Sequence, residues 1–162
     1  MSLLILVLPQ PLRRQIVEEA RAAYPREGCG LIEGMRDGAE IRVTAIHPVA
    51  NLAEEPDRFE LDPARHIALL RGLRGTGREI VGCYHSHPNA CAEPSARDRA
   101  GAFEDGFLWL IEAVDGAGNC DVRAYLAEHG EFHPLEIVEP DSTQMSYIKR
   151  PSPPRSRGRG IG

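Results

Sequence analysis

The segment that most restricts the fold of this chain is residues 82–98, where an apolar strand pattern ends in HSHP and a helix start follows. Side chains alternate along a strand, so His85 and His87 point to the same face. Asp98 arrives eleven residues after His87, just inside the expected helix, and two prolines stiffen the loop between them. The strand end and the helix start must therefore lie close together, with the two imidazoles and the carboxylate in one place.

Two imidazole nitrogens and one carboxylate oxygen make three ligands, which suits a catalytic zinc whose fourth position is left to water. The sequence therefore predicts a Zn²⁺ site at His85, His87 and Asp98, and metal-assisted hydrolysis as the reaction class. Each part alone has a simpler interpretation. A His-x-His pair is often a surface or core pair, and Ser95-x-x-Asp98 has the form of a helix capping box. The combination of the two patterns is what favours the metal site.

The same residues resemble a known family. The spacing H-x-H-P-x(6)-S-x-x-D, which begins here at His85 and ends at Asp98, resembles the JAMM (MPN+) zinc metallopeptidases. An earlier element, PREGCGLIEG at positions 25–34, is similar to the family's P-x-E-x-C-G-L-hydrophobic-x-G and places Glu27 in the catalytic position. The resemblance continues through Asn51 and residues 57–63, covers about residues 3–138, and best fits the compact bacterial branch.

The resemblance implies a zinc metallopeptidase or isopeptidase that hydrolyses the amide bond after the C-terminal Gly-Gly of a ubiquitin-like or sulfur-carrier protein. Glu27 would be the general base, and His85, His87 and Asp98 would hold Zn²⁺. Ser95 would donate a hydrogen bond to the oxyanion. A hydroxyl has one proton and two lone pairs, so Ser95 can cap the helix and stabilise the oxyanion at once.

Two other functions remain open. RadC-like proteins associated with DNA repair share the motif spacing, but they usually show HNHPSG where this chain has HSHPNA. A non-catalytic scaffold of the same fold is the second alternative, which the intact ligand set disfavours.

The short connection from His87 to the strand near Leu108 leaves little room for an insertion that grips a second ubiquitin. We therefore expect recognition of one ubiquitin-like protein, with its tail added as a strand.

Periodicity predicts runs of strands with helices interspersed. This order predicts an α+β fold with a curved mixed β-sheet flanked by helices, and the resemblance adds the JAMM/MPN, cytidine-deaminase-like arrangement. The expected helices are Pro9–Tyr24, the segment from Asp62 to about Arg74, and Ser95–Glu104. The expected strands are Leu3–Leu8, Glu27–Gly34, Ala39–His47, Glu79–His85, Leu108–Asp115, Cys120–Leu126 and Glu131–Val138.

Charge and composition divide the chain into a domain at residues 1–138 and a basic Pro/Gly/Arg-rich tail at 139–162, which we expect to be disordered. The whole chain has a formal charge of −5, while residues 148–162 carry five basic residues and no acidic ones. The remainder is therefore strongly acidic. An acidic body disfavours nucleic acid as a partner and suits a basic protein partner.

The four cysteines and the lack of a long apolar segment predict a reduced, cytoplasmic protein with no membrane contact. Cys29 and Cys83 fall inside apolar strand patterns and are expected to be small buried residues. Cys91 lies four residues after His87. It is either an exposed loop thiol, which we favour, or an inhibitory or redox-sensitive zinc ligand. The sequence does not predict the oligomeric state.

Overall fold

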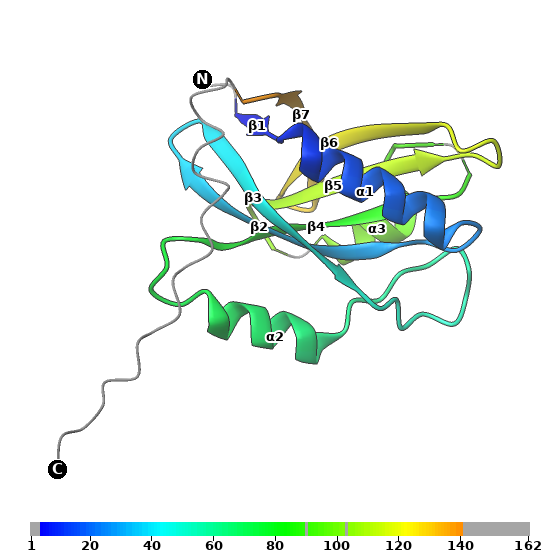
Figure 1. Ribbon diagram of the computed structural model, residues 1–162, viewed down its shortest axis with the longest axis horizontal. Helices are drawn as coiled ribbons and strands as arrows, with labels where there is room; N and C mark the ends of the chain where they lie inside the picture. The colour runs from blue at the N-terminus through cyan, green and yellow to red at the C-terminus, as the bar shows by residue number, and fades with distance from the viewer. Residues whose placement is uncertain (1–3, 90, 103, 141–162) are drawn as a thin grey trace, which may run out of the picture.

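The structure is a computed structural model that describes residues 4–89, 91–102 and 104–140. All the helices and strands predicted from the sequence are present, with ends shifted by a few residues (Figure 1). In chain order they are β1 (Ile5–Val7), α1 (Gln10–Ala23), β2 (Cys29–Asp37), β3 (Glu40–Val49), α2 (Pro63–Gly72), β4 (Glu79–His87), α3 (Ala96–Gly101), β5 (Phe107–Val114), β6 (Cys120–Glu128) and β7 (Glu131–Val138).

The strands form a mixed sheet in the order β1-β3-β2-β4-β5-β6-β7. β1 pairs in parallel with both β3 and β7, which closes the sheet into a barrel, and β4 pairs in parallel with β5. The other neighbours are antiparallel. The α+β class and the mixed, curved sheet are as predicted, and closure through the short β1 goes further than the sequence indicated. Closure removes the unpaired strand edges that an open sheet would expose.

Two hydrophobic clusters cover the two faces of the sheet. One lies under α1, whose buried Ile16 is part of it. The other lies toward α2 and α3, and Leu69 and Leu73 of the α2 region pack against it. α1 and α2 accordingly lie on different sides of the sheet in Figure 1. The central strands β4 and β5 are buried on both faces, so a side chain near their ends is held within packed surroundings.

Three differences from the predicted boundaries affect the candidate site. β4 continues past the predicted end at His85 to His87, so His87 as well as His85 is part of the strand. β2 begins at Cys29 and leaves Glu27 just before the strand. α3 ends at Gly101 instead of Glu104. The start of α2 is as predicted, because the Asp62 side chain accepts a hydrogen bond from the Ala64 amide at 3.0 Å.

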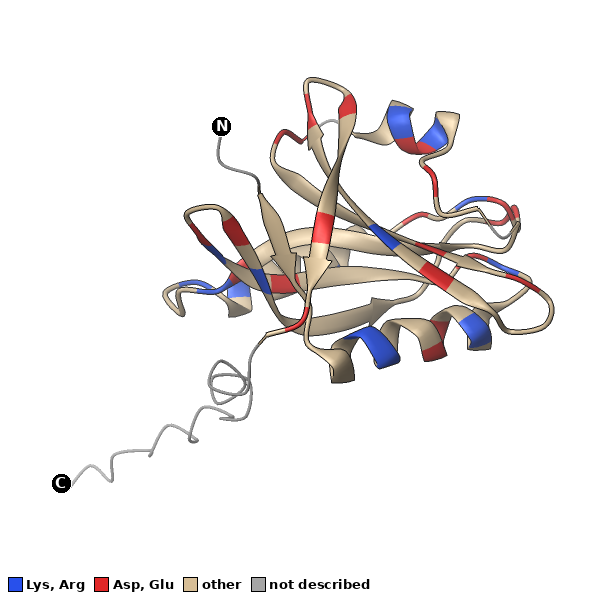
Figure 2. Ribbon diagram, turned by 90° about the horizontal axis from the view of Figure 1, so that it is seen from above, with Lys and Arg blue, Asp and Glu red and all other residues tan. Residues whose placement is uncertain are grey.

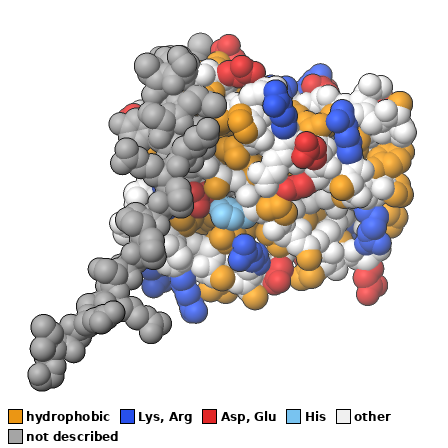
Figure 3. Space-filling view, viewed as in Figure 1, with side chains coloured by type: hydrophobic (Ala, Val, Ile, Leu, Met, Phe, Trp, Pro, Cys, Tyr) orange, Lys and Arg blue, Asp and Glu red, His pale blue; other side chains and the backbone are white. Residues whose placement is uncertain are grey.

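Charged residues are spread over strands, loops and helices (Figure 2) and are interspersed with hydrophobic side chains on the face shown in Figure 3. Among the described residues, no helix is both long enough and apolar enough to cross a membrane. The sequence predicts a tail at residues 139–162, and residues 141–162 of it lie outside the part of the chain that the structure describes.

Candidate functional site

The end of β4 and the start of α3 meet, as the sequence predicted. Nε2 of His85 lies 3.1 Å from Oδ1 of Asp98, and Nε2 of His87 lies 3.1 Å from Oδ2 of the same carboxylate. The two Nε2 atoms are 2.9 Å apart. All three side chains are buried. The two histidines share a face of β4 because they are two residues apart in a strand.

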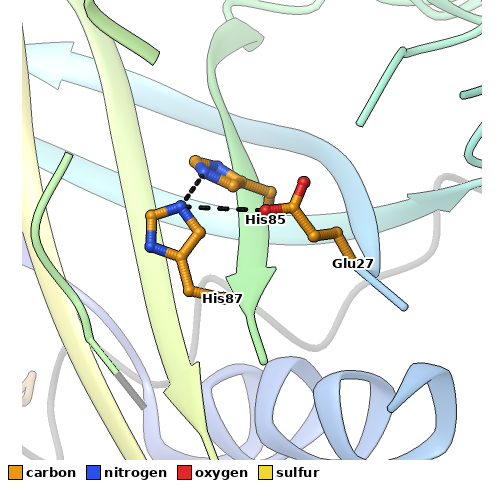
Figure 4. Close-up of side chains that lie close together, drawn as sticks. All are labelled: Glu27, His85 and His87. Atoms are coloured by element: carbon orange, nitrogen blue, oxygen red, sulfur yellow. Dashed lines mark hydrogen bonds and ion pairs between the residues drawn. The ribbon is translucent and has the colours of Figure 1, made fainter. Parts of the chain in front are cut away.

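Glu27 joins this cluster from the segment before β2. Its Oε1 lies 3.9 Å from Nε2 of His87, and the ligand atoms of Glu27, His85 and His87 all lie within 4.8 Å of one another (Figure 4). The Glu27 side chain is also buried. The structure therefore brings together four donor side chains that are separated by up to 71 residues in the sequence.

Two residues to which the sequence had assigned no role hold Glu27 in place. Ser86, between the two histidines, accepts a hydrogen bond from the Gly28 amide at 2.8 Å and donates its own amide to the Gly28 carbonyl at 2.9 Å. The Asn51 side chain donates to the Glu27 carbonyl at 2.9 Å. The sequence does contain a sign of this role for Ser86. Side chains alternate along a strand, so Ser86, between the two histidines, faces the other side of β4.

The arrangement of donors fits a bound cation. An imidazole Nε2 has a single hydrogen-bonding position. Each Nε2 here nevertheless faces both the other imidazole and an Asp98 oxygen, so one proton cannot serve both contacts. Ligands about 2.0–2.1 Å from a tetrahedral zinc are about 3.3 Å apart, close to these separations. A metal ion therefore matches the donor set better than hydrogen bonds do.

The ionisation of the cluster follows from its burial. Burial raises the pKa of Glu27 to about 7; His87 opposes this rise and Asp98 adds to it. Burial acts against the Asp98 carboxylate as well, but its close contacts with both histidines outweigh burial and hold its pKa well below the usual range. Burial lowers the pKa of His85. A carboxyl group that titrates near 7 beside an ionised carboxylate is suited to proton transfer at neutral pH.

Ser95 is the N-cap of α3 and forms the predicted capping box. Its Oγ accepts a hydrogen bond from the Asp98 amide at 3.1 Å, and its amide donates to Oδ2 of Asp98 at 2.8 Å. The cap uses a lone pair of the hydroxyl, and its proton has no acceptor among the described residues. The hydroxyl proton is thus free for another partner, as the sequence analysis anticipated.

Two hollows meet at the cluster. One, of about 720 Å³, extends from Glu27 and Asp98 past the apolar side chains of Phe59, Leu61 and Trp109. The other, of about 440 Å³, lies beside His87 and Pro94. Glu27 and Ser95 line both. The two hollows therefore adjoin at Glu27 and Ser95.

The cysteines are all free, and their burial agrees with the sequence analysis. Cys29 and Cys83 are buried and Cys91 is exposed. Cys91 does contact the site, but through its main chain, because Nδ1 of His87 lies 2.8 Å from its carbonyl oxygen. This contact places the His87 proton on Nδ1 and leaves Nε2 free to act as a ligand.

Comparison with known proteins agrees with this geometry. The family described as prokaryotic homologs of the JAB domain matches residues 9–128. A desampylase of Haloferax volcanii is 40% identical over 122 residues, which cover 75% of this chain and 84% of that protein. A probable TtuB-protein conjugate cleaving protease of Thermus thermophilus is 32% identical over 140 residues, covering 83% and 84%.

Solved structures show the same fold. A solution structure of a Desulfitobacterium hafniense protein is 30% identical, covers 84% of this chain and 93% of that one, and superposes with a TM-score of 0.74. A JAB1/MPN domain protein of Archaeoglobus fulgidus, 21% identical, covers 84% of this chain and all of that one, with a TM-score of 0.54.

Proposed function

The chain belongs to the prokaryotic homologues of the JAB domain, the JAMM (MPN+) metalloproteases, and from this membership and the geometry of the site we propose that it cleaves conjugates of a ubiquitin-like or sulfur-carrier protein with a bound zinc ion. The observation that carries the proposal is the convergence of His85, His87 and Asp98 beside a buried Glu27. Relatives named for cleaving such conjugates match most of the chain.

We assign the metal ligands to His85, His87 and Asp98. Their donor atoms lie 2.9–3.1 Å apart, whereas the nearest contact of Glu27, at 3.9 Å from Nε2 of His87, is longer. These residues would hold a zinc ion, which would provide Lewis-acid chemistry and lower the pKa of a bound water. The longer Glu27 distance favours a role as general base, because a fourth protein ligand would take the position that a catalytic zinc leaves to water.

Glu27 is the general base in this assignment. Its carboxylate accepts a proton from the attacking water and then delivers it to the leaving amine, and a pKa near 7 allows both steps at neutral pH. Ser95 donates its free hydroxyl proton to the oxyanion of the tetrahedral intermediate. The larger hollow, with its apolar lining, receives the C-terminal tail of the ubiquitin-like protein. The smaller hollow receives the leaving group.

The proposal also covers the alternative functions, the partner, the location and the extent of the catalytic domain. The relatives favour cleavage of conjugates over the RadC-like and scaffold alternatives, because both proteins named above are described by a cleavage activity or as a protease. We propose a protein partner that is the ubiquitin-like substrate, rather than nucleic acid or a membrane. We also propose a cytoplasmic location, which four free thiols support, and a catalytic domain at residues 1–138 that does not need the tail at 139–162.

Intact-mass spectrometry tests this function directly. Ubiquitin-like and sulfur-carrier proteins, each extended past Gly-Gly, are incubated with the zinc-loaded protein, with a chelated sample, and with Glu27→Gln. We expect cleavage directly after Gly-Gly only with the zinc-loaded wild type. Cleavage in the chelated sample would contradict a metalloprotease, and no cleavage of any carrier by a zinc-loaded protein would contradict the substrate class.

A further inference from the structure

The two histidines of the site are held in different ways. Nδ1 of His87 donates to the Cys91 carbonyl at 2.8 Å, which is the usual outer contact of a metal-binding histidine. Nδ1 of His85 is fully buried and has no hydrogen-bond partner among the residues that the structure describes. Since a ligand histidine almost always donates its second ring nitrogen to an acceptor, another contact must fix the His85 ring.

Aromatic rings surround His85 instead. The ring of Phe59 stacks on it with centroids 4.2 Å apart and planes 18° apart. Trp109 meets His85 at its edge, with a centroid distance of 5.8 Å and an angle of 87°, and lies edge-on to Phe59 at 6.0 Å. In close-packed surroundings these two rings restrict the rotation of the His85 ring.

We propose that Phe59 is a positioning residue of the metal site, whose stacked ring fixes the plane of His85 in place of the missing outer hydrogen bond. The inference rests on the proposed role of His85 as a metal ligand. It assigns a purpose to a residue that lies outside every helix and strand, in the segment between β3 and α2.

Asn51 holds Phe59 in position. Its side-chain nitrogen donates to the Arg58 carbonyl at 2.8 Å, and its oxygen accepts from the Glu60 amide at 3.0 Å, so it bonds to the residues on both sides of Phe59. The same nitrogen donates to the Glu27 carbonyl at 2.9 Å. One amide group therefore fixes both the ring that packs on His85 and the main chain of the proposed general base.

The alternative is that Phe59 only fills space in the hydrophobic cluster that contains Trp109. Phe132 is a matched control for this alternative. It is half-buried like Phe59, and it also packs edge-on against Trp109, with centroids 5.3 Å apart and planes at 84°. Its ring makes no aromatic pair with His85 among the described residues. Truncation of Phe132 removes packing from Trp109, as truncation of Phe59 does, but it removes no ring that pairs with His85.

The test measures metal affinity by chelator competition and the visible absorption of the cobalt-substituted protein, after unfolding curves show that each variant is folded. We expect Phe59→Leu to weaken zinc binding roughly 10-fold or more and to change the cobalt spectrum. Phe59→Tyr, which keeps the stacked ring, should behave like the wild type, and so should Phe132→Leu. If Phe59→Leu does not fold, Phe59→Met fills the space with a flexible side chain and replaces it.

Unchanged zinc affinity in Phe59→Leu, or an equal loss in Phe132→Leu, would overturn the inference. His85→Ala separates the inference from the function on which it rests. If His85→Ala binds zinc as tightly as the wild type, the ligand assignment itself is wrong. If His85→Ala loses zinc while Phe59→Leu keeps it, only the role of Phe59 is wrong.

Discussion

Ser95 and Asp98 hydrogen-bond to each other in both directions at the start of α3. The Asp98 amide donates to Oγ of Ser95 at 3.1 Å, and the Ser95 amide donates to Oδ2 of Asp98 at 2.8 Å. That carboxylate also lies 3.1 Å from Nε2 of each site histidine. The helix cap and the candidate metal site therefore share one side chain, and capping fixes the direction in which its oxygens point.

Substitutions of Ser95 should distinguish its effect on stability, as the N-cap of α3, from its effect on the cleavage rate, as the proposed hydroxyl donor. An N-cap serine replaced by alanine typically costs about 1 kcal/mol of stability, and glycine costs only a few tenths. Both changes remove the hydroxyl proton, so we expect Ser95→Ala and Ser95→Gly to lower kcat by a similar factor of about 10²–10³. Cleavage rates and urea unfolding curves measure the two effects. Activity that is retained in the glycine variant but lost in the alanine variant would assign the effect to the cap.

Removal of the Glu27 carboxylate should abolish cleavage without loss of the metal. Glutamine has nearly the same size but cannot accept the proton, and a general base typically contributes about 10²–10⁴ to the rate. We expect Glu27→Gln to bind zinc in the same ratio as the wild type and to lose at least 10² in kcat. Metal analysis and intact-mass assays provide the two readings. Loss of zinc from this variant would make Glu27 a ligand rather than a base.

Removal of a ligand histidine, unlike removal of the Glu27 carboxylate, should affect metal binding as well as cleavage. We expect His87→Ala to lose both zinc and cleavage, because only His85 and Asp98 of the proposed ligands would remain. His133→Ala, at an exposed position of β7, is the control for the general loss of a histidine. Metal analysis after dialysis makes the comparison. Full zinc content in His87→Ala would show that the ligand assignment is wrong.

The sequence was sufficient for the elements and for the meeting of β4 with α3, because these depend on periodicity, capping and short spacing. It did not indicate the closure of the sheet, since β1 pairs with residues 40–42 and 136–138, far away in the chain. It also gave no role to Phe59 or Asn51, whose contacts lie in a segment without periodic structure. Local patterns predict which side chains can meet, while the supporting contacts depend on the packing of distant segments.

The rate of cleavage should depend on pH through Glu27. The base must be ionised, and burial raises its pKa to about 7. We therefore expect kcat to rise with pH through the acidic range and to level off below about pH 7, because a bound cation lowers the pKa of Glu27 from its value in the metal-free site. Zinc content is measured at each pH, since protonated histidines release metal. A constant kcat across the acidic range, with zinc still bound, would contradict this role.

Glu112 of β5 is a buried carboxyl group that the proposed chemistry does not use. It is 1% exposed, and its Oε1 has no hydrogen-bond partner among the described residues. By register it lies beside Ser86, whose side chain faces away from the histidines. Burial raises its pKa well above the ordinary value, and the nearby Glu19 adds to the rise. Glu112 is therefore protonated in the folded protein at pH values where it is ionised in the unfolded chain.

This shift predicts how stability changes with pH. Between the ordinary pKa of about 4.3 and the raised pKa, the folded state binds more protons than the unfolded state, so stability falls as pH rises. Glu112→Gln removes this dependence. Its stability relative to the wild type should increase with pH by up to about 1.4 kcal/mol per unit. Urea unfolding in chelator at several pH values measures this difference, with Glu18→Gln, an exposed site on α1, as the charge control. Parallel curves for the wild type and Glu112→Gln would show that Glu112 ionises in the folded state as it does in the unfolded chain.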